Sequence, residues 1–244
     1  MLLLALDTAT PAVTVALHDG SAAVAEVSAV DPRRHGELLS AFVDEALRKA
    51  GAGFGDLTAI AVGIGPGPYT GLRAGVVTAR VLGSALAIRT DGICSLDVIA
   101  AQAAAGSSAG SSPREGSASV TSGASSALDG IALATDGSDF LVVTDARRRE
   151  VYWARYRPDG LRCAGPHVGR PADLPGGLPV AGEAGLLPAE LGSQVLEPRY
   201  PSAAVLAKLA VERLLAAVPP DLAEPLYLRR PDAREPGPPK RVTP

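Results

Sequence analysis

The sequence predicts an α/β fold built from two related halves, of which the second is degenerate. Segments with strand and helix patterns alternate over the first hundred residues, then a Ser/Gly/Ala-rich stretch follows, and further strand patterns lead to a closing helix. The chain has 244 residues, enough for one or two domains. Its residues are 47% hydrophobic but only 4% aromatic, so Ala, Val, Leu and Ile must build the core.

Charge and cysteine content limit the classes of function. The net charge of −3 argues against a self-sufficient nucleic-acid surface, which needs an excess of basic residues, but leaves room for a role in a larger complex. The two cysteines, Cys94 and Cys163, are far apart and lack metal-site spacing, which indicates a reducing compartment. No segment resembles a signal peptide or a membrane span. We therefore expect a soluble, cytoplasmic protein.

Three strands open the first half. Residues 2–6 form a continuous apolar run, which is typical of a strand buried on both faces. Apolar residues alternate over 13–17, and Asp19-Gly20 gives a hairpin signal before a third strand at 22–27. The pattern predicts a three-stranded antiparallel meander.

Two helices and a further strand follow. Apolar residues at helical spacing predict a helix over 35–50, with a cap at Asp31-Pro32 and an end at Gly51. Residues 58–62 read as a buried strand, and residues 72–86 as the second helix.

The turn between that strand and the second helix is Gly-Pro-Gly-Pro-Tyr-Thr-Gly-Leu-Arg, residues 65–73. Its glycines allow positive φ, its prolines fix φ, and Thr70 is predicted to cap the helix. Free N–H groups at a helix N-terminus can bind an anion, although the turn can equally be a plain β–α connection.

Small residues recur every four positions along the second helix, at Gly71, Gly75, Ala79 and Gly83. Each glycine inside a helix costs up to about 1 kcal/mol relative to alanine, so the stripe requires a packing reason. Close packing inside the chain and close packing against a partner chain both remain open.

The rest of the chain is less regular. A short strand at 87–89 precedes a helix over 95–105 that Ser95 is predicted to cap, and residues 106–127 are almost entirely Ser, Gly and Ala, which predicts disorder. Strands are predicted at 131–135, 140–144, 150–156 and 179–181, little regular structure over 157–179, and a last helix from the cap Ser202 to Ala217. The predicted units are an N-terminal subdomain (1–105), the insert (106–127), a second subdomain (128–200), a C-terminal helix and following segment that can pack back on the first subdomain (201–230), and a loose tail (231–244).

Several strings resemble the TsaB family, the partner subunits of the bacterial machinery that makes threonylcarbamoyladenosine beside the tRNA anticodon. The main ones are Asp7-Thr8-Ala9-Thr10 and the turn at 65–73, the latter placed after a strand and before a helix. Supporting strings lie at 35–39, 92–96, 145–152 and 225–229. The resemblance is fuller over the first hundred residues than over the second half.

The resemblance implies an actin/Hsp70/sugar-kinase-like (ASKHA) fold and assembly with the catalytic paralogue TsaD and the ATPase TsaE. It also implies a homodimer when the chain is alone, only indirect contact with tRNA, and no membrane contact. In the family the first two helices form the dimerisation surface. Carried onto this chain, that surface comprises His35, Leu38, Leu39, Phe42, Val43, Ala46, Leu72, Arg73, Gly75, Val76, Ala79 and Arg80.

The resemblance also bears on catalysis. Ser95 and Ile99 stand where the catalytic paralogue has two metal-binding histidines, and isoleucine cannot ligate, so no metal site is expected. In the first phosphate loop Ala9 replaces a glycine and Pro11 lacks an N–H. Asp7, Thr8 and Thr10 remain candidates for a weak or shared nucleotide contact, although Asp7 is better explained as a turn-stabilising carboxylate. No cofactor is expected.

The prediction is therefore a non-catalytic subunit that dimerises with TsaD. Two alternatives from other classes are a stand-alone ASKHA ATPase or kinase and a metallopeptidase, the latter disfavoured by the missing histidine pair. His35 is interpreted as an exposed residue at a helix start or as an interface contact. Asp145 and Arg147 are interpreted as an ion pair at a strand end.

Overall fold

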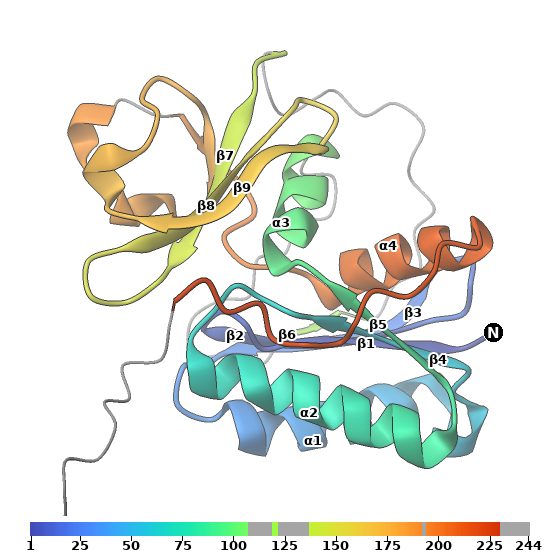
Figure 1. Ribbon diagram of the computed structural model, residues 1–244. Helices are drawn as coiled ribbons and strands as arrows, with labels where there is room; N and C mark the ends of the chain where they lie inside the picture. The colour runs from blue at the N-terminus through green and yellow to red at the C-terminus, as the bar shows by residue number, and fades with distance from the viewer. Residues whose placement is uncertain (107–118, 122–136, 192–193, 230–244) are drawn as a thin grey trace, which may run out of the picture.

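The computed structural model describes residues 1–106, 119–121, 137–191 and 194–229, and these form two β-sheets with helices packed on and between them (Figure 1). The strand order of the first sheet is β5-β4-β1-β2-β3-β6, and that of the second is β11-β10-β7-β8-β9. In the described part of the chain, no helix is long and apolar enough to cross a bilayer.

The first sheet confirms the predicted meander. Strands β1 and β2 pair antiparallel, as do β2 and β3, and every residue of β1 is buried. Strand β4 lies parallel to β1 on its other side, and β5 lies parallel to β4. The bounds are β1 Leu3–Asp7, β2 Ala12–His18, β3 Ala23–Val30, β4 Ala59–Gly63, β5 Arg89–Ile93 and β6 Ser119–Thr121.

Helices cover both faces of this sheet (Figure 1). On one face, α1 and α2 pack over Leu4 and Leu6 of β1, and on the other α4 packs over Leu3 and Ala5. The alternation of β1 side chains therefore feeds two separate cores. Helix α3 packs against the second sheet and against α4. The bounds are α1 His35–Ala50, α2 Tyr69–Leu86, α3 Ser95–Ala104 and α4 Ala203–Leu215.

The second sheet repeats the topology of the first. Strands β7, β8 and β9 form an antiparallel meander, β10 lies parallel to β7, and β11 lies parallel to β10. Where the first half has α1 and α2, the described residues of the second half have only the 3-10 turns Pro171–Asp173, Ala184–Leu186 and Ala189–Leu191. This confirms two related halves with the second degenerate. The bounds are β7 Phe140–Asp145, β8 Val151–Tyr156, β9 Arg162–Gly169, β10 Val180–Gly182 and β11 Val195–Leu196.

Three predicted helix caps are wrong. Helices α1, α2 and α3 begin after Arg34, Pro68 and Cys94, and none of these capping positions makes a side-chain hydrogen bond. The predicted caps were Asp31-Pro32, Thr70 and Ser95. The cap of α4 is correct, because the Ser202 hydroxyl accepts from the N–H groups of Ala204 and Val205. Gly51 ends α1 in the left-handed conformation, as predicted.

Strand predictions were mixed outside the two meanders. The short strand expected at 87–89 is β5, which begins at Arg89. The stretch 157–179 contains β9, whose Gly165-Pro166 and polar residues hide its strand character from a pattern search. Of the insert at 106–127, the structure describes Gly106 and strand β6, which departs from the expected disorder. The remainder of the insert, the predicted strand at 131–135 and the tail at 231–244 lie outside the described residues.

After α4 an extended segment, residues 218–229, crosses from one half to the other, and we call it the strap (Figure 1). The N–H of Gly92 in β5 donates to the carbonyl of Asp221, and the N–H of Leu226 donates to the carbonyl of Ile64. The strap ends at the β7–β8 turn, where Arg229 pairs with Glu150. The strap therefore links the edge of the first sheet to the second half.

Candidate functional site

The small-residue stripe of α2 faces the chain's own first sheet. A Cβ added at Gly75 would lie 2.5 Å from the Thr8 hydroxyl oxygen, and one at Gly83 would lie 2.0 Å from that of Thr90. Gly75 donates its N–H to Thr8 Oγ1 (3.0 Å), and this hydroxyl donates to the carbonyl of Gly71 (2.7 Å). Of the two open readings, packing inside the chain is correct, since only a helix without side chains here can approach so closely.

Asp7 ends β1 in a fully buried position. Its Oδ2 accepts a hydrogen bond from the Ser95 hydroxyl (2.6 Å), and its Oδ1 accepts from the N–H of Ala9 (2.7 Å). Ser95 Oγ in turn accepts from the N–H of Gly65 (3.2 Å). Ser95 therefore ties α3, the first loop and the Gly-Pro turn together instead of capping its helix.

Burial raises the pKa of Asp7, and this effect outweighs the lowering by the hydrogen bonds from Ser95 and Ala9 and by the charge of His35. The carboxyl is held by protein groups on both oxygens and has no solvent contact. This geometry matches the turn-stabilising role predicted for Asp7.

The two other nucleotide candidates are also engaged inside the chain. Thr8 bonds to α2, and Thr10 Oγ1 accepts from the N–H of Ala12 (3.3 Å). The turn at 65–73 rests directly on this loop, because a Cβ on Gly67 would lie 2.1 Å from the carbonyl oxygen of Ala9. The backbones of the two loops are therefore in direct contact.

The positions that correspond to the metal-binding histidines are structural. Ile99 is completely buried in the core between α3 and the second sheet, together with Leu96 and Tyr156. The Ser95 hydroxyl is committed to Asp7. Within the described residues, no three His, Cys, Asp or Glu side chains are grouped so that they could hold a metal ion.

Most residues predicted for the partner interface lie in the interior, which corrects that prediction. Hydrophobicity at helical spacing marks the side that faces the sheet, and these residues build the core beneath α1 and α2. His35 and Leu38 are half-buried, and only Arg73 and Arg80 are exposed. The buried members are Leu39, Phe42, Val43, Ala46, Leu72, Gly75, Val76 and Ala79.

His35 is half-buried, not fully exposed. Its Nε2 lies 2.8 Å from the carbonyl oxygen of Thr10, so the ring can donate a hydrogen bond that ties the start of α1 to the first loop. The predicted ion pair at the end of β7 is confirmed, with 3.2 Å between Arg147 Nη1 and Asp145 Oδ2.

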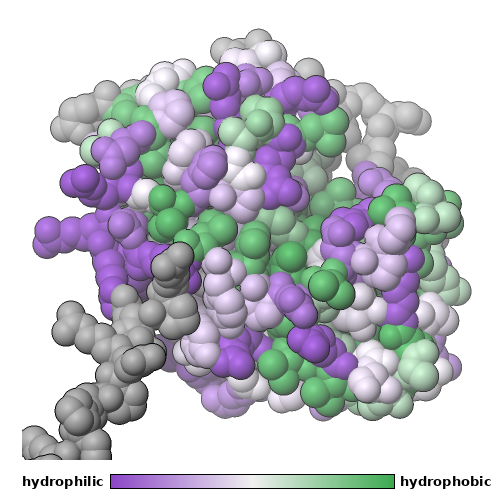
Figure 2. Space-filling model, in the orientation of Figure 1, coloured by the Kyte–Doolittle hydropathy of each residue, from purple (hydrophilic) through white to green (hydrophobic). Residues whose placement is uncertain are grey.

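An exposed stripe on α2 is formed by Tyr69, Arg73, Val77 and Val81, and we call it the outer face of α2. Of these residues, sequence reasoning had named only Arg73 as an interface residue. The exposed fractions are 56% for Tyr69, 51% for Val77 and 60% for Val81. Each residue lies two positions after or before a member of the glycine stripe, about 200° around the helix. The glycine stripe could therefore have located this face. Figure 2 shows hydrophobic residues at the surface in the lower part of the view, where α2 runs.

A stacked pair of tyrosines lies at one end of the outer face of α2. The Tyr227 ring of the strap stacks on Tyr69, with 5.5 Å between centroids. The Arg73 guanidinium lies 4.9 Å from the centroid of the Tyr69 ring and donates to its hydroxyl. Tyrosine and arginine are enriched at protein-binding surfaces.

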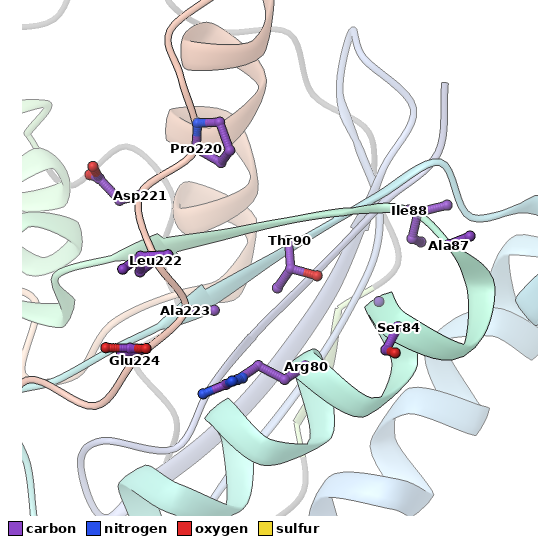
Figure 3. A pocket seen from close by; sticks show the side chains of 11 residues that line it. Arg80, Ser84, Ala87, Ile88, Thr90, Pro220, Asp221, Leu222, Ala223 and Glu224 are labelled. Carbon is purple, nitrogen blue, oxygen red and sulfur yellow. The ribbon is translucent and has the colours of Figure 1, made fainter.

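A cavity of about 350 Å³ lies at the opposite end of α2, between that helix, β5 and the strap (Figure 3). Arg80, Ser84, Thr90 and Glu224 are among its polar lining residues. Thr8 contacts the first turns of α2, so this cavity is separate from the Asp7 loop. It contains none of the residues predicted to bind a nucleotide.

The raised pKa of Asp7 gives a test by pH. The folded protein holds this proton where the unfolded chain releases it, so Asp7 lowers stability as pH rises from about 4 through the raised pKa. Asp7→Asn should therefore gain melting temperature relative to the parent as pH rises. Hydrogen bonds from Ser21 and Ala22 lower the pKa of Asp19 to about 2. Asp19→Asn should therefore lose melting temperature relative to the parent as pH rises from about 2 to about 4. A pH-independent difference for Asp7→Asn would contradict the buried-carboxyl account.

Comparison with known proteins places this geometry in a family. A family model described as "TsaD: tRNA N6-adenosine threonylcarbamoyltransferase" matches residues 27–128. The chain is 42% identical over 245 residues to the uncharacterized protein ML0378 of Mycobacterium leprae, covering 96% of this chain and 56% of that protein. It is 30% identical over 159 residues to the tRNA threonylcarbamoyladenosine biosynthesis protein TsaB of Escherichia coli, covering 65% of this chain and 56% of that protein. The chain thus spans about half the length of these two relatives.

A solved structure shares the fold of this chain over nearly its whole length. YeaZ from Pseudomonas aeruginosa superposes with a TM-score of 0.69 at 25% identity, covering 93% of this chain and all of that one. The repeated sheet topology is that of the ASKHA fold, as expected. Sequence relatives, fold and the strings around Asp7 and residues 65–73 lead to one assignment. The chain belongs to the TsaB family.

Proposed function

We propose that this chain is a non-catalytic subunit that binds TsaD and supports the transfer of threonylcarbamoyl to the adenosine beside the tRNA anticodon. Family membership supports the pathway, and the names of the relatives refer to threonylcarbamoyladenosine biosynthesis and threonylcarbamoyl transfer. The observation that carries the non-catalytic role is the internal bonding of Asp7 and Thr8. A loop that already satisfies its polar groups inside the fold has none to offer a phosphate.

The outer face of α2 is the proposed surface for TsaD. Its exposed valines offer apolar surface and its Tyr-Arg cluster supplies residue types that are enriched where proteins bind one another. The same face would serve a homodimer when TsaD is absent, and TsaE would join through TsaD. The buried residues of α1 and α2 hold this face in place from the inside.

A stand-alone ATPase or kinase is the main rival. It would need Asp7, Thr8 and Thr10 to turn toward solvent, which would break the bonds to Ser95, Gly71, Gly75 and Ala12. Calorimetry of the isolated chain with ATP and magnesium separates the two readings. Tight binding with turnover would favour the rival, and we expect neither.

Reconstitution tests the proposed function. Purified TsaD, TsaE and the adenylate-forming enzyme are incubated with threonylcarbamoyl precursors and tRNA, with and without this chain. We expect modification to depend on the chain, because the proposed role of this subunit is to support the transfer that TsaD catalyses. Modification that proceeds unchanged without the chain would sink the proposal.

A further inference from the structure

One arginine and two tyrosines form a cluster where the strap meets the start of α2 (Figure 1). The ring of Tyr227 stacks on that of Tyr69, with an angle of 23° between the ring planes. Arg73 lies one helical turn after Tyr69, places its guanidinium over the Tyr69 ring and donates to the Tyr69 hydroxyl. Helix α2 and the strap therefore build this cluster together, and we call its three residues the strap cluster.

The strap cluster is exposed but ordered by its own contacts. All three of its residues are exposed. Partial burial raises the pKa of Tyr227, and the charge of Arg73 opposes that rise, so the guanidinium acts on the Tyr227 ring as well as on Tyr69. A guanidinium held against aromatic rings loses less freedom when it binds an acceptor than one that moves freely.

Arg73 makes no ion pair within the described residues. Most carboxylates of the two neighbouring elements, α1 and the strap, are paired with another cation. These pairs are Arg34–Glu37 and Lys49–Glu45 on α1, and Arg213–Asp221 beside the strap. Asp31, which precedes α1, adds to the effect of Glu37 in raising the pKa of Arg34. Each of these carboxylates is thus engaged by a cation other than Arg73.

Two further carboxylates of these elements, Asp44 and Glu224, lie away from Arg73. His35 lies against α2, and Asp44 follows it by nine residues, which places Asp44 about 180° around α1 from that contact. Glu224 lines the cavity together with Arg80, which is about 10 Å further along α2 than Arg73. Helix α2 itself contains no acidic residue. Arg73 is therefore a fixed, exposed cation whose remaining N–H groups are available to a partner.

We propose that the strap cluster binds a carboxylate of TsaD, with Arg73 as the residue that contacts it and Tyr227 as the residue that positions Arg73. A guanidinium stacked on a ring presents its N–H groups at its edge, where they match the two oxygens of a carboxylate. The exposed Val77 and Val81 continue from Arg73 along α2, so the matching surface of TsaD is apolar with an acidic residue at one end. The inference rests on the proposed function for the identity of the partner.

A second copy of this chain fits the strap cluster less well than an acidic partner. The α2 helix of a second copy would bring Arg73 and Arg80 to the contact but no carboxylate. Like charges that meet in an interface weaken it. The strap cluster therefore favours assembly with TsaD over self-association through the same face.

The affinity of the full chain for TsaD, measured by calorimetry between about 50 and 300 mM salt, tests the role of Arg73. Arg73→Met keeps the length of the side chain and removes its charge. We expect it to bind at least about 30-fold more weakly at low salt and with less salt dependence than the parent. Arg73→Lys should be intermediate, because it keeps the charge but loses the planar fork.

Arg170→Met is the matched control for Arg73→Met. Arg170 follows β9 in the second half, and its side chain is 78% exposed. This variant should bind TsaD with the affinity and the salt dependence of the parent. If Arg73→Met binds as the parent does, or if the two methionine variants lose equal affinity, the inference is overturned.

A double-mutant cycle tests the positioning role of Tyr227. Tyr227→Phe keeps the stacked ring and should bind TsaD as the parent does. Tyr227→Ala should weaken binding about threefold to tenfold and reduce its salt dependence, because Arg73 is then held less well. Combined with Arg73→Met, it should cause no further loss. Additive losses would contradict the positioning role, and equal melting temperatures of the variants check that the fold is kept.

Self-association separates an acidic partner from a second copy. Sedimentation equilibrium should show that Arg73→Met self-associates at least as well as the parent, and an equal loss of self-association and TsaD binding would overturn the inference. If the parent binds TsaD and Arg73→Met binds it equally well, only this inference fails. If the parent does not bind TsaD at all, the proposed function fails and this inference fails with it.

Discussion

Val77→Glu combined with Val81→Glu should release this chain from TsaD while leaving its fold intact. Both side chains are more than half exposed, so glutamate at these positions meets water in the free chain. In the complex the same carboxylates would be buried without a partner, a situation that disrupts interfaces strongly. We expect the dissociation constant to rise about 100-fold, which corresponds to about 2.7 kcal/mol.

Val24→Glu combined with Val195→Glu is the matched control for this experiment. Val24 lies on β3 and Val195 on β11, at exposed fractions of 44% and 66%, and neither belongs to α2. Sedimentation velocity of each variant mixed with TsaD gives the affinity, and circular dichroism checks the fold. If the α2 pair binds TsaD as the parent does, or if both pairs lose binding equally, the outer face of α2 is not the interface.

Gly75→Ala should destabilise the fold by roughly 2–4 kcal/mol, although alanine is the better helix former. The new methyl group would lie 2.5 Å from Thr8 Oγ1 and 3.3 Å from a Leu6 methyl carbon. Relieving these contacts pushes α2 away from the sheet, which breaks the bonds that Thr8 makes to Gly71 and Gly75. Urea denaturation of the two proteins measures the difference.

Gly36→Ala provides the same chemical change without the contact. Gly36 lies in α1, and a Cβ added there has no atom within 4 Å. This variant should be as stable as the parent or up to about 1 kcal/mol more stable. If the two glycine variants lose equal stability, the close approach of α2 to Thr8 does not hold the fold together.

Local sequence patterns were sufficient to predict the strands and helices whose apolar residues recur at a clear strand or helix period. The meander β1–β2–β3 followed from alternation and the Asp19-Gly20 turn, and α1 followed from its apolar spacing, because these signals lie within a few residues of one another. Strand β9 was missed since its pairing with β8 depends on a partner strand and not on its own composition. Three of the helix caps failed for a related reason: backbone geometry places Arg34, Pro68 and Cys94 at the capping positions without side-chain bonds.

The site was harder to predict because its contacts join distant parts of the chain. The bond from Ser95 to Asp7 connects residues 88 apart, and the bond from Gly75 to Thr8 connects residues 67 apart. The interface residues were carried over from the first two helices of the family, and most of them are apolar residues on the core side of these helices. Leu39 and Val76 accordingly proved buried, while Val77, the neighbour of Val76, points outward. The glycine stripe shows which side of α2 faces the sheet, and the exposed face could have been predicted as the side opposite to it.

The yield of modified tRNA as this chain is titrated into a fixed amount of TsaD tests the central claim most directly. TsaE, the adenylate-forming enzyme, precursors and tRNA are kept in excess, and threonylcarbamoyladenosine is measured by mass spectrometry. A required, non-catalytic partner predicts that the rate rises from near zero, saturates at one chain per TsaD, and is unchanged when Asp7→Asn replaces the parent. A rate that is already maximal without the chain, or that falls with Asp7→Asn at full TsaD occupancy, would contradict the account.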